Sequence, residues 1–168
     1  MGGVSNGARL SKIRSKLMRI VKHKLDYKTP WMLPDIYIFT ANNTLKKNGA
    51  LVMGAGAAKD CRDAYDGIDL KIGSKIKENV DYFLKLIDIS SEQKIGVFQV
   101  KRHYSNNADI NLIKKGAEIL KELAEASPNN IFHMNFPGIG FGNLEYNDVL
   151  KVLKILPDNV LIYEGEKI

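Results

Sequence analysis

Residues Asn48 to Arg62 read NGALVMGAGAAKDCR, and this stretch decides how the rest of the chain is interpreted. Three glycines (Gly49, Gly54 and Gly56) fall close together, and an alanine-containing segment of helical character follows them. Glycines just before a helix let the backbone approach a ligand, and the N-terminus of the helix adds a partial positive charge. The stretch therefore predicts a loop that holds a phosphate or a diphosphate.

A second glycine-rich segment, FPGIGFGNLEY, runs from Phe136 to Tyr146 between a strand-like run and a helix-like run. In open α/β sheets, ligands sit at the C-terminal ends of strands, which is where both glycine loops fall. One such loop is a weak indication of a ligand site, whereas two in matching contexts can grip a diphosphate from both sides.

Strand-like and helix-like segments alternate along the chain, which predicts an α/β sandwich with a parallel or mixed sheet. The polar turn SSEQK is expected to pair two of the strands. The predicted strands cover residues 36–40, 82–89, 95–100, 131–135 and 160–163, with a short extended segment at 50–53. The predicted helices cover residues 57–65, 74–79, 108–126 and 147–156.

The N-terminal part of the chain is strongly basic. Residues 9–28 contain eight Lys or Arg residues and one acid, Asp26, whereas the remainder of the chain is close to balanced. Apolar residues recur at helical spacing over 10–25, which predicts an amphipathic basic helix. Its apolar stripe either docks on the domain while its charges meet solvent, or the helix contacts nucleic acid or an anionic membrane surface.

Length and composition indicate one domain with an extension. The 168 residues are 45% apolar, enough for a core, but they include no apolar run long enough to cross a membrane. Pro30 and Pro34 predict a boundary, with residues 1–33 as the basic extension and residues 34–168 as the domain. The single Cys61 excludes an intramolecular disulfide and fits a reducing compartment, so we expect a cytoplasmic protein.

Several common nucleotide and metal motifs are absent. The first loop lacks the GxxxxGK of a P-loop, and it does not match GxGxxG followed by an acidic residue at the end of the next strand. HExxH, paired CxxC and GxSxG are also lacking, and the three histidines (His23, His103 and His133) have no ligand spacing. We therefore expect no metal and no cofactor apart from the ligand itself.

Taken together, the two loops resemble those of the macro domain, an ADP-ribose-binding α/β/α module. The similarity is nearest to the branch of the DNA-ADP-ribosyl glycohydrolase antitoxins and related bacterial and phage proteins, whose loops resemble VMGKGIA and GCGLGGLDW. Here the matching segments are VMGAGAA (52–58) and GIGFGNLEY (138–146), and FQVKRHY followed by ADINLI also looks like an element of related proteins. The resemblance covers residues 35–164 and implies a three-layer α/β/α sandwich with a mixed central sheet.

The resemblance also implies which residues contact ADP-ribose. Phe141 would lie against the terminal ribose or pack into its own core. Asn42 or Asn48 would contact the distal ribose, and Asp35 would either accept a hydrogen bond from the adenine amino group or simply begin a strand. The diphosphate and its neighbouring ribose would lie between the first loop (Gly54, Ala55, Gly56 and Ala57) and the second (Gly138, Ile139, Gly140, Phe141, Gly142 and Asn143).

For catalysis the resemblance points to Glu145, which stands where the glycohydrolase motif has an Asp. Its carboxylate would act as a base or stabilise an oxocarbenium ion, with Asn48 as a second group that positions water, or it would be a first-turn acid favoured by the helix dipole. Some relatives use a lysine on the helix after the first loop. The aligned residue here is Arg62, a poor nucleophile, which leaves Lys59 as the only substitute and argues against a covalent lysine mechanism.

These features predict a protein that binds ADP-ribose, or an ADP-ribosylated macromolecule, and hydrolyses the ADP-ribosyl group from its target. The alternatives are a non-catalytic reader of ADP-ribose and a phosphatase for ADP-ribose 1″-phosphate. The basic N-terminal residues add the expectation that the modified target is a nucleic acid.

Overall fold

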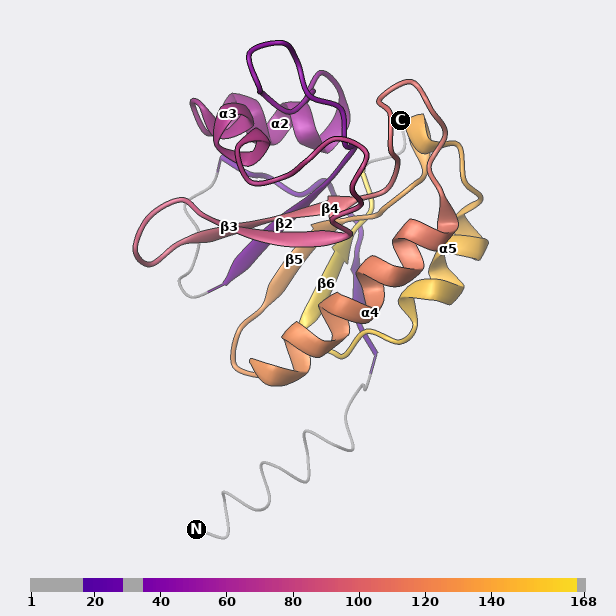
Figure 1. The fold of residues 1–168 in the computed structure, drawn as a ribbon. Helices are drawn as coiled ribbons and strands as arrows, with labels where there is room; N and C mark the ends of the chain where they lie inside the picture. Colours follow the sequence, from indigo (N-terminus) through magenta and orange to yellow (C-terminus); the bar gives the residue numbers. More distant parts are fainter. Residues whose placement is uncertain (1–16, 29–34, 166–168) are drawn as a thin grey trace, which may run out of the picture.

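The computed structural model describes residues 17–28 and 35–165, in which six strands form one sheet in the order β1-β6-β5-β2-β4-β3 (Figure 1). All neighbouring strands are parallel except β3 and β4, which are antiparallel. The sheet is therefore mixed, as predicted. The strands are β1 (Arg19–Val21), β2 (Ile36–Ala41), β3 (Leu84–Asp88), β4 (Lys94–Gln99), β5 (Phe132–Asn135) and β6 (Val160–Tyr163).

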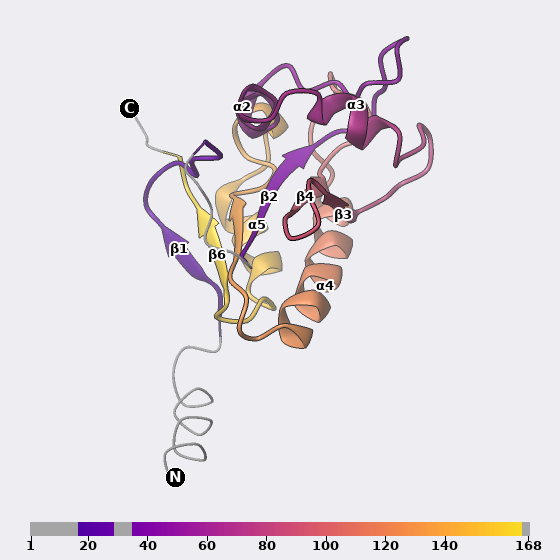
Figure 2. The same ribbon diagram turned by 90° about the vertical axis from the view of Figure 1, so that its left-hand side faces the viewer.

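Helices cover both faces of this sheet, so the predicted three-layer α/β/α architecture is confirmed (Figures 1 and 2). One face carries α2 (Gly56–Ala64) and α3 (Ile68–Gly73), and the other carries α4 (Ile110–Ala126) and α5 (Tyr146–Leu153). A 3-10 turn, η1 (Gly140–Gly142), precedes α5. Within the described ranges, none of the helices has the length and apolar character needed to cross a membrane.

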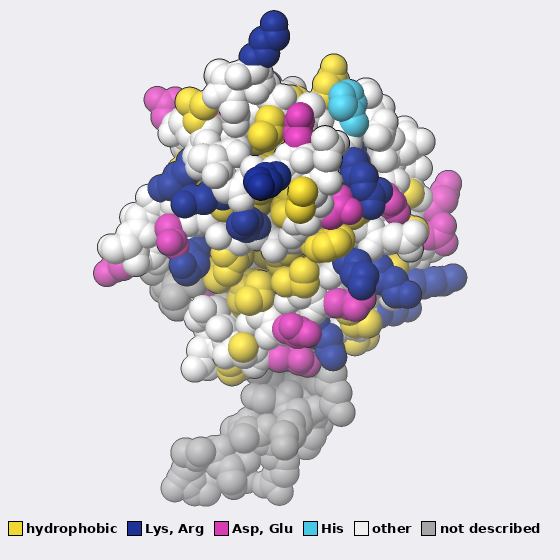
Figure 3. Space-filling view, viewed as in Figure 1, with side chains coloured by type: hydrophobic (Ala, Val, Ile, Leu, Met, Phe, Trp, Pro, Cys, Tyr) yellow, Lys and Arg dark blue, Asp and Glu magenta, His cyan; other side chains and the backbone are white. Residues whose placement is uncertain are grey.

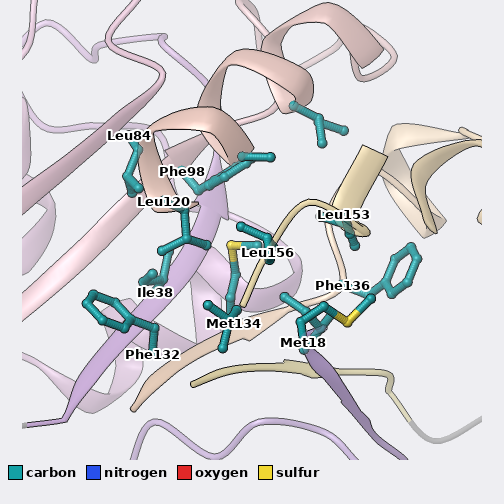
Figure 4. Packing of buried hydrophobic residues seen from close by; sticks show 14 of the residues in the cluster. Met18, Ile38, Leu84, Phe98, Leu120, Phe132, Met134, Phe136, Leu153 and Leu156 are labelled. Carbon is teal, nitrogen blue, oxygen red and sulfur yellow. The ribbon is translucent and has the colours of Figure 1, made fainter. Parts of the chain in front are cut away.

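The two layers of core follow from the alternation of side chains along the strands. Ile38 faces the α4 and α5 layer and the next residue, Phe39, faces the α2 and α3 layer, and both are fully buried. Figure 4 shows the first of these layers, in which Phe98 lies beneath α4. Gly116 lets α4 approach this closely, because a Cβ there would lie 2.6 Å from Cζ of Phe98. Because one-residue shifts would move these side chains to the wrong face, the two core layers fix the register of the strands. The register in turn determines where the loops after the C-terminal ends of the strands leave the sheet.

Most predicted elements are present, but one helix is displaced. The helix predicted over 74–79 is wrong: the observed helix α3 ends at Gly73, and Ser74 is its C-cap. Gly67, with φ of +77°, starts α3 earlier, and the segment after Ser74 instead turns through a bridge between Lys77 and Val80. The extended segment predicted at 50–53 contributes only an isolated bridge between Leu45 and Leu51.

The predicted N-terminal helix is also wrong where the structure describes it. Residues 10–16 of that prediction lie outside the described residues, while Arg19–Val21 form β1 and pair with β6. Main-chain pairing with the open edge of β6 satisfies the backbone groups of this segment, and burial of Met18, Leu25 and Tyr27 adds apolar contacts. Residues before the predicted boundary at 33 therefore contribute a strand and core side chains to the sheet.

Candidate functional site

A cavity of about 1040 Å³ opens at the C-terminal edge of the sheet. Its lining includes the residues that directly follow four strands: Asn42 after β2, Val100 after β4, Phe136 after β5 and Glu164 after β6. Both glycine loops also line it, so the two segments selected from the sequence meet at one site. This is the position expected for a ligand site in a parallel α/β sheet.

The first glycine loop delivers the N-terminus of α2 to the cavity. Ala55 is the N-cap residue in an extended conformation, and no side chain caps the first amide groups of the helix. Gly56 begins the helix with φ of +60°, a value that glycine adopts without steric cost. The uncapped amide groups and the helix dipole together make this wall of the cavity suitable for an anion.

The second glycine loop forms the facing wall through the 3-10 turn η1. Gly140 has φ of +68°, and a Cβ built on it meets no atom within 4 Å, so the backbone here borders open space. Phe141 is 75% exposed, which excludes the alternative that it packs into its own core. Its ring lies near the first loop, because a Cβ on Gly56 would be 3.9 Å from Cδ2 of Phe141.

Polar side chains tie β2 to β5 beneath the two loops. Asn135 donates from Nδ2 to Oγ1 of Thr40 (2.8 Å) and accepts at Oδ1 from the Thr40 amide (3.0 Å). The Tyr27 hydroxyl, which burial keeps protonated by raising its pKa, donates to the Ile38 carbonyl (2.8 Å). These contacts hold the two strands together where the glycine loops diverge from them.

The end of the cavity beside β1 and β6 contains two carboxylates. Lys24 pairs with Asp60 of α2 across 2.9 Å. Glu164 is only 7% exposed and accepts hydrogen bonds from Lys22 (2.9 Å) and from the Tyr146 hydroxyl (2.9 Å). The hydrogen bond from Lys22 to Glu164 raises the pKa of that lysine, so its ammonium stays protonated. Hydrogen-bond acceptors therefore line this end.

The opposite end, beside β4, contains a half-buried lysine. Lys101 lines the cavity, and burial lowers the pKa of its ammonium below the ordinary lysine value. In the described part of the chain no carboxylate pairs with Lys101, in contrast to Lys24, which pairs with Asp60. The rim beyond it is formed by the β4–α4 loop, where Tyr104 is 56% exposed. Burial therefore disfavours the charged form of the amine at this end of the cavity.

Nearly all residues predicted to contact the ligand line the cavity. Of the two candidate asparagines, Asn42 lies at the cavity and Asn48 does not; Asn48 instead accepts a hydrogen bond from the Ala50 amide within its own turn (3.0 Å). The predicted residues that line the cavity are Asn42, Gly54, Ala55, Gly56, Ala57, Gly138, Ile139, Gly140, Phe141, Gly142 and Asn143.

Asp35 lies away from the cavity. It precedes β2, so it stands at the opposite end of a six-residue strand, about 20 Å from the C-terminal edge. Its carboxylate accepts from the Ile131 amide (3.2 Å) and lies 3.0 Å from Nε2 of His133. Of the two interpretations of Asp35, the structure supports the strand-entry residue.

Glu145 does not line the cavity either. It is the exposed N-cap residue of α5, and its side chain makes no capping hydrogen bond. Lys59 and Arg62 are also outside the lining, and Lys59 pairs with Asp63 on α2 across 2.8 Å. Neither position that the resemblance offers for a lysine mechanism therefore reaches the cavity, whereas Lys101 lines it. The position of Lys101 directly after the strand predicted over 95–100 was the signal in the sequence that could have found it.

Comparison with solved structures finds the same fold in many chains, among them three bacterial proteins, while no family model matches the chain and no curated protein matches its sequence. The macrodomain of Thermus aquaticus DarG is 16% identical, with a TM-score of 0.64 over 90% of this chain and 99% of that chain. The macrodomain of Mycobacterium tuberculosis DarG is 19% identical, with a TM-score of 0.65 over 89% and 99%. Thermosipho africanus DarTG in complex with ADP-ribose is 19% identical, with a TM-score of 0.59 over 80% of this chain and 39% of that one.

Proposed function

Because this chain has the macrodomain fold, we propose that its cavity binds ADP-ribose and that the protein removes ADP-ribosyl groups from a modified target. The observation that carries the proposal is that both glycine loops wall one cavity, with the uncapped N-terminus of α2 on one side. A structural neighbour, Thermosipho africanus DarTG, was solved in complex with ADP-ribose. A diphosphate between the two loops would meet backbone amides and the positive end of a helix dipole.

The two ends of the cavity suit the two ends of this ligand. The carboxylates of Glu164 and Asp60 beside β6 offer acceptors for the adenine amino group. The opposite end, with Lys101, would then hold the distal ribose, whose C1″ atom is joined to the target. This orientation brings the amine of Lys101 to the bond that must break, whereas the amine of Lys24, paired with Asp60, lies at the adenine end.

Lys101 is proposed to attack C1″ in its neutral form, which the lowered pKa favours. The amine forms an N–C1″ bond while the bond from C1″ to the target breaks, and the electron pair leaves with the target. The proton lost by the amine neutralises the departing group. Water then adds to C1″, the N–C1″ bond breaks, and lysine and ADP-ribose are released.

Calorimetric titration tests the binding step. We expect ADP-ribose to bind with micromolar affinity, and AMP and NAD to bind more weakly because neither presents a diphosphate together with a free distal ribose. Equal affinity for AMP would show that the second loop contributes nothing. Absence of ADP-ribose binding would overturn the proposal as a whole.

We further propose that the modified target is a nucleic acid. Two exposed aromatic side chains, Tyr104 and Phe141, flank the cavity opening, where a nucleobase could stack. On the face shown in Figure 3, basic and acidic side chains are interspersed. Along the sequence, positive charge is concentrated in residues 9–28, which contain eight Lys or Arg residues and one acid. The basic residues of that segment would supply phosphate contacts.

Removal of residues 1–16 tests this role, because it deletes four basic residues (Arg9, Lys12, Arg14 and Lys16) and leaves β1 intact. We expect the salt dependence of single-stranded oligonucleotide binding to lose about 3 units of log–log slope, since each phosphate contact contributes roughly 0.7. Fluorescence anisotropy at several salt concentrations measures the slope. An unchanged slope would contradict the assignment, and ADP-ribose affinity serves as the control for folding.

A further inference from the structure

The backbone that carries Lys101 is held by a buried polar side chain. Gln99, the last residue of β4, is 0% exposed. Its Nε2 donates to the carbonyl of Lys101 (3.4 Å) and to Oδ1 of Asp81 (2.9 Å). Its Oε1 accepts from the amides of Tyr82 (2.8 Å) and Phe83 (3.2 Å). One buried amide therefore connects the residue at the cavity to the segment that enters β3.

A guanidinium extends this network to the N-terminus of α4. Arg102 donates from Nη2 to Asp81 (2.9 Å) and from Nη1 to Asp109 (2.9 Å), which is the N-cap residue of α4. The two hydrogen bonds raise the pKa of Arg102, and the pKa of Asp109 is lowered by its capping bond to the Asn111 amide and by Arg102. The network therefore runs from Gln99 through Asp81 and Arg102 to α4, and Gln99 connects it to the carbonyl of Lys101.

The loop is also fixed from the other side. The carbonyl of Arg102 accepts from the Asn43 amide (3.1 Å), and Oγ1 of Thr44 accepts from the Tyr104 amide (3.1 Å). Phe83, whose backbone amide donates to Oε1 of Gln99, has φ of +57°. This conformation costs energy in a non-glycine residue. Such strain persists only where the surroundings over-determine it, and it clusters at functional sites.

We propose that Arg102 is a positioning residue, whose bridge between Asp81 and Asp109 holds the Lys101 amine in the cavity. The inference rests on the proposed function, because the amine matters only if C1″ is brought to it. The side chain of Arg102 is 56% exposed. Ion pairs formed by side chains this exposed add little to the free energy of unfolding. Its bridge is therefore better explained by geometry, since small misplacements of a reacting group cost large factors in rate.

The test uses the aldehyde that ADP-ribose exposes when its distal ribose opens. The Lys101 amine and this aldehyde form an imine with loss of water, and cyanoborohydride supplies the hydride that reduces the imine to a stable secondary amine. Peptide mass spectrometry then locates and times the adduct. In the full chain we expect Arg102→Ala to slow labelling of Lys101 by about tenfold or more, while ADP-ribose affinity stays within about twofold. Arg62→Ala, an arginine outside the cavity, should leave both unchanged.

A double-variant measurement shows whether Arg102 and Asp81 act through one bridge or independently of each other. Asp81→Asn should slow labelling in the same way, and the double variant with Arg102→Ala should be no slower than either single variant, because one bridge is lost in each. Labelling of Arg102→Ala at the rate of the unmodified chain, with the same affinity, would overturn the proposal.

Nuclear magnetic resonance keeps the inference testable if Lys101 is never labelled or ADP-ribose does not bind. Either result alone would contradict the proposed function, not the bridge. Titration of the Lys101 Cε signal in Asp81→Asn then decides. Loss of a carboxylate by itself lowers the pKa of a nearby ammonium, whereas release of Lys101 into solvent raises it. A rise in the pKa of Lys101 supports the positioning role of Arg102, and a fall or no change in that pKa overturns it.

Discussion

Replacement of Lys101 by alanine should lower the turnover of an ADP-ribosylated substrate by roughly 10²–10⁴-fold, the range for loss of a reacting side chain. ADP-ribose should still bind, because the diphosphate contacts come from backbone groups of the two glycine loops. Single-turnover release of ADP-ribose, followed by chromatography, measures the rate. Calorimetry on the same variant measures the affinity.

The pH dependence of this reaction has a defined sign. The neutral amine is the attacking form, so turnover rises as the pH rises through the pKa of Lys101. Burial lowers that pKa, so the rise should occur below the ordinary lysine value of about 10.4.

Two matched variants complete the experiment. Glu145→Gln removes a carboxylate that the structure leaves outside the cavity, and Lys59→Ala removes a lysine that pairs with Asp63 on α2. Both should retain full turnover. If Glu145→Gln were the slow variant and Lys101→Ala the fast one, the assignment of Lys101 would be wrong.

Substitution of Gly140 by valine should weaken ADP-ribose binding by at least about 100-fold, which corresponds to roughly 2.7 kcal/mol. Gly140 has φ of +68°, which a β-branched residue adopts only with strain, and the new side chain would enter open space at the cavity wall. Calorimetric titration measures the loss.

The chain offers a closely matched control for this substitution. Gly67 has φ of +77° and also lacks neighbours within 4 Å of an added Cβ, but it lies between α2 and α3, outside the cavity. Gly67→Val should therefore lower thermal stability to a similar degree while leaving ADP-ribose affinity unchanged. If Gly140→Val and Gly67→Val bound ADP-ribose with equal affinity, the second loop would not border the ligand.

The glycine loops could be predicted because local chemistry determines them. Gly56, Gly138 and Gly140 have positive φ values. Where a loop must turn sharply before a helix, this conformation favours glycine, so the sequence itself indicates such loops. The alternation of strands and helices was equally local, so the three layers and the mixed sheet followed. For the same reason eleven predicted contact residues reach one cavity.

The errors arose where a residue's role depends on distant partners. For Asp35 the resemblance leaves two interpretations, an adenine contact and a strand-entry residue, and only the direction of β2 shows that it lies at the far end. The segment around Arg19 has helical periodicity, yet the unpaired edge of β6, more than a hundred residues away, draws it into the sheet. Lys101 lies in the segment FQVKRHY and follows a predicted strand, but the burial that lowers its pKa depends on tertiary contacts that the sequence does not show.

The pairing of β1 with β6 has a consequence for synthesis. Arg19–Val21 are among the first residues of the sheet to leave the ribosome, and their partners Leu161–Tyr163 are among the last. Glu164, which forms the acidic wall of the cavity, emerges later still and joins Val21 through its amide. A nascent chain therefore exposes an unpaired edge and an open site until residues 160–164 have been synthesised, and the ligand can be captured only after β6 has docked.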